Sequence, residues 1–196
     1  MLALLNFVAF QIGWFAAVLG AANNVPWAGP LVIAGAIALH LGVVDRPREE
    51  LALILICGLI GAVMDSVLVA AGWVAYPSGS IVDFAAPYWI VAMWMLFATT
   101  LNLSMGWLKS RKLVGAAFGL IGGPLAYYTG FKLGGIEFVV FDTAIVALGI
   151  VWAIAVPVLL LLAERFNGVS APIARTGEGS ATNASFAEER RLRSNG

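Results

Sequence analysis

The chain has 196 residues, of which 61% are hydrophobic and only 11% are charged, and its formal net charge is zero. In soluble domains about a quarter of the residues are charged, so this composition excludes an ordinary water-soluble enzyme and predicts an all-α, polytopic membrane bundle. The basic residues are few and scattered, which argues against nucleic-acid binding, and the single cysteine, Cys57, excludes a disulfide within the chain.

Six apolar stretches that approach the length needed to cross a bilayer, roughly 20 residues, follow one another along the chain. They cover residues 2–22, 27–44, 51–72, 87–107, 113–130 and 142–162. Residues 131–141 contain Gly134, Gly135 and Glu137, which favour a turn at the outer face, with a short re-entrant segment as the alternative. We therefore predict a transmembrane domain over 1–163 and, from the polar composition that follows, a flexible cytoplasmic tail over 164–196.

The charges in the connections predict the orientation. Basic residues gather in the connections that follow the even-numbered stretches, whereas the odd-numbered connections hold only Lys132. By the positive-inside rule both termini are expected in the cytoplasm. The residues on which this depends are Arg46, Arg48, Lys109, Arg111, Lys112 and Arg165.

Asp65 is the only formal charge between Leu51 and Gly79. A carboxylate inside a membrane costs roughly 2.5–3.5 kcal/mol on insertion scales, so it needs a partner, a proton or a function. Gly58 and Gly61 lie on its side of the predicted helix, and small residues of this kind mark a contact with another helix. Asp65 is therefore expected in the interior of the bundle.

The partners of Asp65 must be neutral, because no Lys or Arg lies at its depth in any stretch. Gln11, Trp14, Tyr127 and Tyr128 lie at compatible depths. Two interpretations stay open. Asp65 is either a functional acid, which transfers a proton in catalysis or transport or hydrogen-bonds a substrate, or a buried hydrogen-bonding group that joins two helices.

A second polar set lies in the half of the bundle nearer the cytoplasm. It consists of Asn6, His40, Thr99, Thr100, Asn102 and Ser104, which alternating helix directions can bring to one level. His40 is the only histidine, and one histidine without cysteines or clustered carboxylates does not make a metal site. Two interpretations of His40 stay open. It belongs to the substrate site, where it acts as a general base or binds a lipid phosphate, or it hydrogen-bonds a neighbouring helix. Thr99 and Thr100 are expected to bond back to the preceding turn.

The fifth stretch repeats glycine at four-residue spacing, at Gly115, Gly119 and Gly123, which predicts a helix-contact stripe. Pro124 leaves a backbone carbonyl one turn earlier without its donor, and such a kink often borders a cavity. Tyr127 follows directly. This region is the second indication of a binding pocket.

Four motifs together resemble one family. They are NFVAFQIGWFAAVLGA, the GxxxD of Gly61 to Asp65, PYWIVAMWMLFATTLN and GAAFGLIGGPLAYYTG, and the resemblance covers residues 6–165. The chain is similar to a family of small bacterial inner-membrane proteins catalogued as a domain of unknown function. The resemblance implies that Trp14, Asp65, Trp94, Pro124 and Tyr127 are characteristic positions. It also implies a lipid-linked role, since such proteins are encoded near enzymes that modify membrane fatty acids.

Three functions remain open. The first is an enzyme or accessory subunit of membrane lipid or fatty-acid modification, with membrane lipid as its ligand. The second is a small proton-coupled transporter that works as a homo-oligomer, and the third is a non-catalytic scaffold with a protein partner in the membrane. No cofactor or metal is expected. The candidate substrate-binding residues are Asn6, Gln11, Trp14, His40, Trp94, Asn102 and Tyr127, with Asp65 as the candidate catalytic acid.

Overall fold

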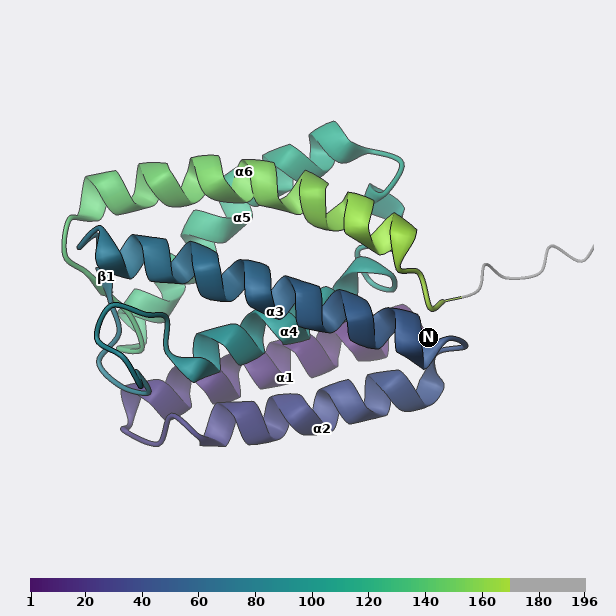
Figure 1. The fold of residues 1–196 in the computed structure, drawn as a ribbon, viewed down its shortest axis with the longest axis horizontal. Helices are drawn as coiled ribbons and strands as arrows, with labels where there is room; N and C mark the ends of the chain where they lie inside the picture. The colour runs from purple at the N-terminus through teal and green to yellow at the C-terminus, as the bar shows by residue number, and fades with distance from the viewer. Residues whose placement is uncertain (170–196) are drawn as a thin grey trace, which may run out of the picture.

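The computed structural model describes residues 1–169 as an all-α bundle whose helices run back and forth beside one another (Figure 1). Its helices are α1 (Leu2–Ala22), α2 (Ala28–Val43), α3 (Pro47–Ala70), α4 (Tyr88–Leu101), α5 (Lys112–Lys132) and α6 (Phe141–Arg165). The predicted stretches and these helices correspond one to one. The predicted tail, 164–196, lies outside the described residues from position 170 onward.

Two helix boundaries differ from the prediction by four residues or more. α3 begins at Pro47, four residues before the predicted start, because proline suits the first turn of a helix and the two glutamates beside it favour the positive end of the helix dipole. α4 ends at Leu101, six residues before the predicted end, and is followed by a turn and a 3-10 helix, Gly106–Leu108. Near this end the hydroxyls of Thr99 and Thr100 bond to backbone carbonyls of the preceding turn, as predicted, and compete with the helical ladder.

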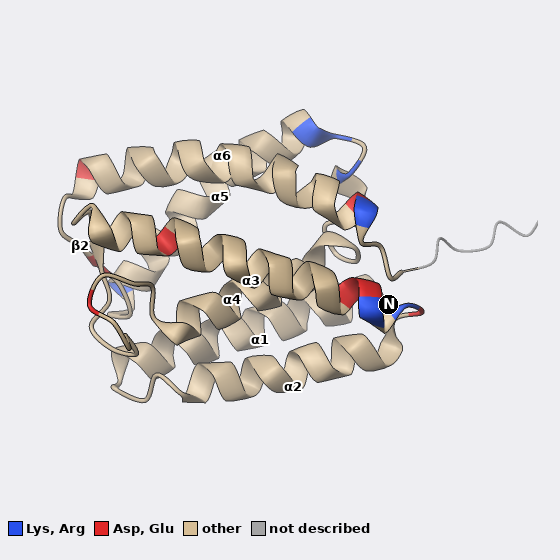
Figure 2. Ribbon diagram, in the orientation of Figure 1, with Lys and Arg blue, Asp and Glu red and all other residues tan. Residues whose placement is uncertain are grey.

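Three of the helices, α1, α3 and α6, are long and apolar enough to cross a membrane, and α2 and α4 are shorter apolar helices. Large apolar side chains on the outside of the bundle are exposed, among them Leu31, Leu39, Leu59, Val63, Leu125 and Ile154. The charged residues of the described part of the chain lie at the two ends of the bundle (Figure 2), and Asp65, in the last third of α3, is the exception. The structure is therefore compatible with a membrane location.

One end of the bundle carries most of the positive charge. Here lie the residues that precede α3, the connection between α4 and α5, and the end of α6 (Figure 2). The first residue and the last described residue lie at this same end (Figure 1). We call it the basic end, and its basic residues are Arg46, Arg48, Lys109, Arg111, Lys112 and Arg165.

The helices pack in two groups. α1, α2, α3 and α4 contact one another, while α5 packs mainly on α6. The predicted glycine stripe of α5 faces α6. A Cβ atom at Gly119 would lie 2.1 Å from the carbonyl oxygen of Trp152, and one at Gly123 would lie 2.3 Å from the Trp152 ring. These glycines let the two backbones approach, and α5 is thereby held away from α1.

The end opposite the basic end is closed by a small antiparallel sheet. Strand β1 (Val74–Ala75) pairs with strand β2 (Glu137–Phe138), with Val74 opposite Phe138. The backbone amide of Val139 also donates to the carbonyl of Trp73. The segment 131–141 is thus the end of α5, a turn and a strand, and of the two predicted alternatives the turn is confirmed.

Candidate functional site

Asp65 is fully buried and accepts three short hydrogen bonds from three different parts of the chain. The hydroxyls of Tyr76 and Tyr127 both donate to Oδ1 at 2.6 Å. The indole Nε1–H of Trp94 donates to Oδ2 at 2.7 Å. We call these four residues the Asp65 cluster. It joins α3 to α4, to α5 and to the segment after β1.

The cluster confirms part of the prediction for Asp65. The carboxyl is interior and its partners are neutral, and Tyr127 is one of them. None of the three bonds comes from Gln11, Trp14 or Tyr128, so these predicted partners are wrong. Tyr76 was missed, although it lies only eleven residues after Asp65, beyond a tight turn at Gly72 whose φ is 68°.

Tyr76 lies beyond the end of α3, and its hydroxyl stays a proton donor. Burial raises the pKa of Tyr76 well above its ordinary value, and the neighbouring Asp65 raises it further. The proton on the Tyr76 oxygen is therefore kept over the whole physiological pH range, and the hydrogen bond to Asp65 is kept with it.

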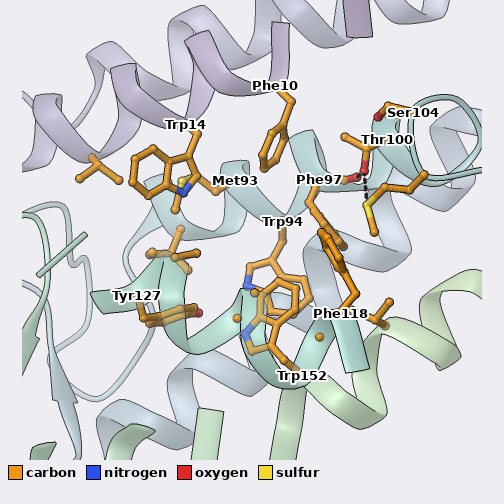
Figure 3. Close-up of a pocket in the computed structure, with 18 of the residues that line it drawn as sticks. Phe10, Trp14, Met93, Trp94, Phe97, Thr100, Ser104, Phe118, Tyr127 and Trp152 are labelled. Atoms are coloured by element: carbon orange, nitrogen blue, oxygen red, sulfur yellow. Dashed lines mark hydrogen bonds between the residues drawn. The ribbon is translucent and has the colours of Figure 1, made fainter. Parts of the chain in front are cut away.

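A cavity of about 220 Å³ lies next to the Asp65 cluster, between α1 and α4 on one side and α5 and α6 on the other (Figure 3). Its walls are mostly aromatic and aliphatic. Trp94 and Trp152 stack with their ring centroids 4.6 Å apart, and Phe97 meets Trp152 edge-on at 5.4 Å. Further lining residues include Phe7, Phe10, Trp14, Val18, Met93, Thr100, Ser104, Phe118, Gly122, Ala126, Tyr127 and Ile136.

Trp94 and Tyr127 belong to both the cluster and the cavity. Each ring lines the cavity, while its polar atom donates to Asp65. Asp65 itself does not line the cavity. The carboxyl therefore fixes the position of the Trp94 and Tyr127 rings from outside the cavity. A molecule in the cavity would contact the rings and not the carboxyl.

Glycine on α3 makes room for Trp94. A Cβ atom at Gly61 would lie 1.9 Å from Cγ of Trp94, which no side chain could tolerate without expelling the indole. Gly61 lies one helical turn before Asp65, so both residues of the GxxxD motif position Trp94. The glycine leaves space for the indole ring, and the aspartate accepts a hydrogen bond from the indole nitrogen.

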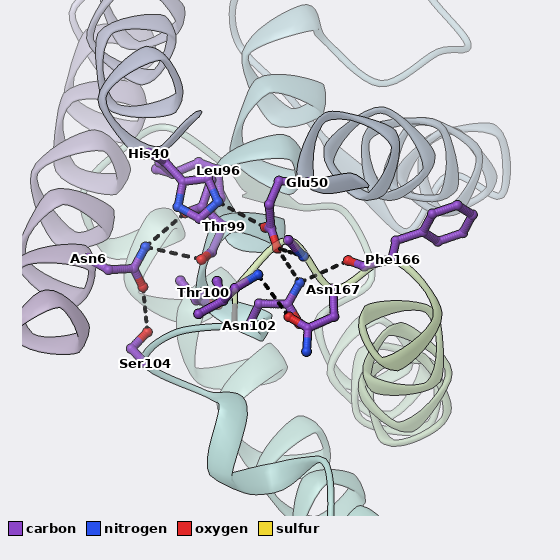
Figure 4. A network of polar contacts seen from close by, with 12 residues as sticks. Asn6, His40, Glu50, Leu96, Thr99, Thr100, Asn102, Ser104, Phe166 and Asn167 are labelled. Carbon is purple, nitrogen blue, oxygen red and sulfur yellow. Dashed lines mark hydrogen bonds and ion pairs between the residues drawn. The ribbon is translucent and has the colours of Figure 1, made fainter. Parts of the chain in front are cut away.

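A second buried carboxyl, Glu50, organises the basic end (Figure 4). Nε2 of His40 lies 2.9 Å from Glu50 Oε2. The amide of Asn102 donates to Oε1 at 2.6 Å, and the backbone amide of Gly168 donates to the same oxygen at 2.8 Å. We call these four residues the Glu50 cluster, and it joins α2, α3, the end of α4 and the segment after α6.

The sequence analysis missed Glu50 because it belongs to a run of charged residues that is typical of a turn. Its spacing from other residues of α3 nonetheless indicated a buried position. Glu50, Ile54, Cys57, Gly61 and Asp65 recur at intervals of three or four residues, and all five are buried on one side of α3.

The rest of the second polar set meets at the same level. Asn6 donates to the carbonyl and the hydroxyl oxygen of Thr99, at 3.1 and 3.2 Å, and accepts from the hydroxyl of Ser104 at 2.8 Å (Figure 4). These bonds join α1 to α4. The set predicted from the sequence is therefore brought together, but as two separate groups.

Not all of the predicted ligand-binding residues lie together. Trp14, Trp94 and Tyr127 line the cavity, whereas Asn6, Gln11, His40 and Asn102 do not. Within residues 1–169 no group of three or more His, Cys, Asp or Glu side chains could hold a metal ion. What the arrangement offers chemically is an apolar, aromatic chamber with hydroxyl groups at one end, backed by a buried acid.

Comparison with known proteins gives one match. A family model described as "Protein of unknown function (DUF2878)" matches residues 3–158, nearly the whole described bundle. Neither the curated proteins nor the solved structures give a match.

Proposed function

The chain belongs to this family of unknown function, and we propose that it is a multi-pass protein of the bacterial inner membrane that binds an acyl chain for the modification of membrane lipids or fatty acids. The three long apolar helices and the exposed apolar side chains around them support the membrane location. A surface of this kind is stable only against other apolar material.

We further propose that all six helices cross the membrane. α2 and α4 have 16 and 14 residues. At about 1.5 Å per residue they reach roughly 24 and 21 Å, somewhat less than the roughly 30 Å of a bilayer core. Support comes from their neighbours, since both lie beside longer helices and are extended by turns at their ends. The basic end is assigned to the cytoplasm by the positive-inside rule.

The observation that carries the functional proposal is the cavity. Its lining is aromatic and aliphatic over most of its surface, and of the described residues that line it only Thr100, Ser104 and Tyr127 carry hydroxyls. Pockets lined in this way hold apolar ligands, and the few polar groups fix their orientation. In a bilayer the most abundant apolar molecules of suitable shape are acyl chains.

The geometry favours an accessory subunit that presents the chain over an enzyme. Among residues 1–169, no acidic, basic or thiol side chain lines the cavity. Asp65, the candidate catalytic acid, would have to act through Tyr127 or Trp94, because both of its oxygens are bonded to these residues and to Tyr76. We therefore assign Asp65 as a positioning residue that holds two walls of the cavity.

The test compares the lipids of a deletion strain complemented by different variants. Gly122 lines the cavity, and a Cβ atom there would meet nothing closer than the Phe118 ring at 3.7 Å. Gly122→Leu therefore fills the cavity without displacing the backbone. Gly42 on α2 has nothing within 4 Å, so Gly42→Leu is the matched control.

Deletion is expected to change the acyl-chain profile of the membrane. Wild type and Gly42→Leu restore the profile, and Gly122→Leu does not. An unchanged profile in the deletion strain would contradict the proposal.

The same strains separate the two alternatives. A proton-coupled transporter needs Asp65 to ionise, so Asp65→Asn would abolish its function completely even where the protein is folded. A scaffold needs neither the cavity nor the charge, so both Gly122→Leu and Asp65→Asn would complement fully.

A further inference from the structure

We propose that the cavity takes a single acyl chain that ends in an anionic group, with the chain inside and the anionic group at the basic end. This inference rests on the proposed function and adds the class of ligand and its direction. Four features of the cavity carry it: its size, the difference between its ends, the charge around one end, and its side opening.

The size fits one chain. The cavity volume of about 220 Å³ is below the roughly 300–1,000 Å³ of pockets that hold larger ligands. Its lining on α1 extends from Phe7 to Val18, which corresponds to about 16 Å along the helix axis. A cavity of this volume and this extent along α1 has room for one chain and not for a second.

The two ends of the cavity differ in polarity. The end away from the basic residues is closed by Val18 and Ile136, of which 0% and 3% of the surface is exposed. The other end carries Thr100 and Ser104, whose hydroxyls already donate to the Phe97 carbonyl and to Oδ1 of Asn6 (Figure 3). Thr100 follows Trp94 by about 9 Å along α4. The closed apolar end suits the end of a tail, and the hydroxyl end suits the start of a polar group.

The charge at the hydroxyl end favours an anion. Arg111 directly precedes α5 and stands about 10 Å along the helix from Phe118, which lines the cavity. Its guanidinium lies 6.0 Å from the ring centroid of Trp107, an exposed aromatic residue of the same end. Lys112, by contrast, is paired with Glu164. We therefore take Arg111 as the basic side chain that meets the anionic group.

The side opening explains how such a ligand enters. Phe7 on α1 and Phe118 on α5 line the cavity, yet 51% and 50% of their surfaces are exposed. α5 packs on α6 rather than on α1, and these two exposed side chains lie on the facing helices α1 and α5. A chain can pass sideways from the bilayer without leaving an apolar environment.

The experiment uses quenching of tryptophan fluorescence by brominated lipids in the purified full-length chain. Trp14, Trp94 and Trp152 line the cavity and serve as the reporters. The probes are 9,10-dibromostearate, 2-bromostearate, 9,10-dibromostearyl alcohol, and lysophosphatidylglycerol and diacylphosphatidylglycerol with 9,10-dibromostearoyl chains. The cavity signal is the quenching that Gly122→Leu removes and Gly42→Leu keeps, with Ala126→Leu as a second filling variant should Gly122→Leu not fold.

The expected result is strong cavity quenching by 9,10-dibromostearate or by the lysophospholipid, and weaker quenching by 2-bromostearate, whose bromine stays near the carboxylate. Arg111→Gln should weaken the binding of the anionic probes about fivefold, the effect of one basic residue at a membrane surface, whereas Arg48→Gln should not. Tighter binding of the fatty acid identifies a free fatty acid as the ligand, and tighter binding of the lysophospholipid identifies a phospholipid headgroup. Both outcomes support a ligand with a single acyl chain and an anionic group.

Three results would overturn the inference while leaving the proposed function intact. They are equal binding of the neutral alcohol, equal binding of the diacyl lipid, or stronger quenching by 2-bromostearate. If no probe gives quenching that depends on the cavity, the proposed function itself is wrong.

Discussion

At the scale of single residues, the buried acid of α3 is satisfied entirely by neutral donors. Asp65 receives one indole and two phenol hydrogen bonds, each of 2.6 or 2.7 Å. A carboxyl held in this way needs no cation, and hydrogen bonds to such a group are among the stronger ones in proteins. Its effect on the ligand is indirect, through the two rings that it holds.

Asp65→Asn is expected to destabilise the bundle by about 1–3 kcal/mol, the cost of leaving a buried polar group unsatisfied. The asparagine oxygen can still accept from the two tyrosines, but its amide then faces the indole N–H of Trp94, and two donors cannot bond. Thermal unfolding in detergent, followed by circular dichroism, measures the change. Asp83→Asn removes the same charge from an exposed loop residue and should unfold like wild type, and an equal shift for both variants would contradict the account.

Gly61→Ala is expected to expel the Trp94 indole from its seat. The new methyl group would overlap the ring, and overpacking of this kind typically costs about 1–3 kcal/mol. The change should appear as a shifted near-ultraviolet circular dichroism signal of tryptophan together with a lower unfolding temperature. Gly42→Ala, where the methyl group meets open space, should change neither, and wild-type spectra for Gly61→Ala would show that the indole is not seated on this glycine.

At the scale of the elements, the basic end is tied together by Glu50. Its carboxylate binds the end of α2 through His40, the end of α4 through Asn102 and the segment after α6 through the Gly168 amide. The carbonyl of Gly168 in turn accepts from the backbone amide of Arg46. Two hydrogen bonds therefore join the start of α3 to Gly168: the Glu50 side chain accepts one, and the backbone amide of Arg46 donates the other.

Glu50→Ala should release this connection. Each buried donor that loses its acceptor typically costs about 1–3 kcal/mol, because it stays buried without a hydrogen-bond partner. Hydrogen–deuterium exchange should therefore become faster at the Gly168 amide and in the first turn of α3. The neighbouring Glu49→Ala should leave exchange at Gly168 unchanged, and protection of that amide in Glu50→Ala would exclude the proposed role.

The limits of prediction from the sequence follow from the same elements. The interior position of Asp65 was predictable because its helix carries glycines on the same side, a pattern that needs only the helical period. Glu50 was not recognised because its charged neighbours predicted a turn, although its spacing from the buried residues of α3 is helical. The Tyr76 contact depends on a turn that folds the chain back, and the end of α4 depends on side-chain hydroxyls that compete with the backbone. None of these is encoded in hydropathy.

At the scale of the whole molecule, the cavity results from how two groups of helices fit together. Glycines draw α5 toward α6, and this leaves a space beside α1 that large aromatic side chains only partly fill. No single stretch of sequence contains such a space, which is why Pro124 and Tyr127 indicated a pocket nearby but not its shape or its walls.

The proposed topology predicts opposite locations for two connections. A reporter fused at Gly79, in the loop before α4, should be active on the outer side of the membrane, and one at Ser110, before α5, on the cytoplasmic side. The paired alkaline phosphatase and green fluorescent protein fusions measure this directly. Activity of both positions on the same side would rule out six crossings with the basic end in the cytoplasm.

The most direct test of the central claim, that an acyl chain occupies the space between α1 and α5, is native mass spectrometry of the purified protein. Wild type and Gly42→Leu are expected to retain a bound mass that corresponds to one single-chain lipid, and Gly122→Leu to lose it while keeping its helical content. A bound mass retained equally by Gly122→Leu, or absent from wild type, would contradict the account.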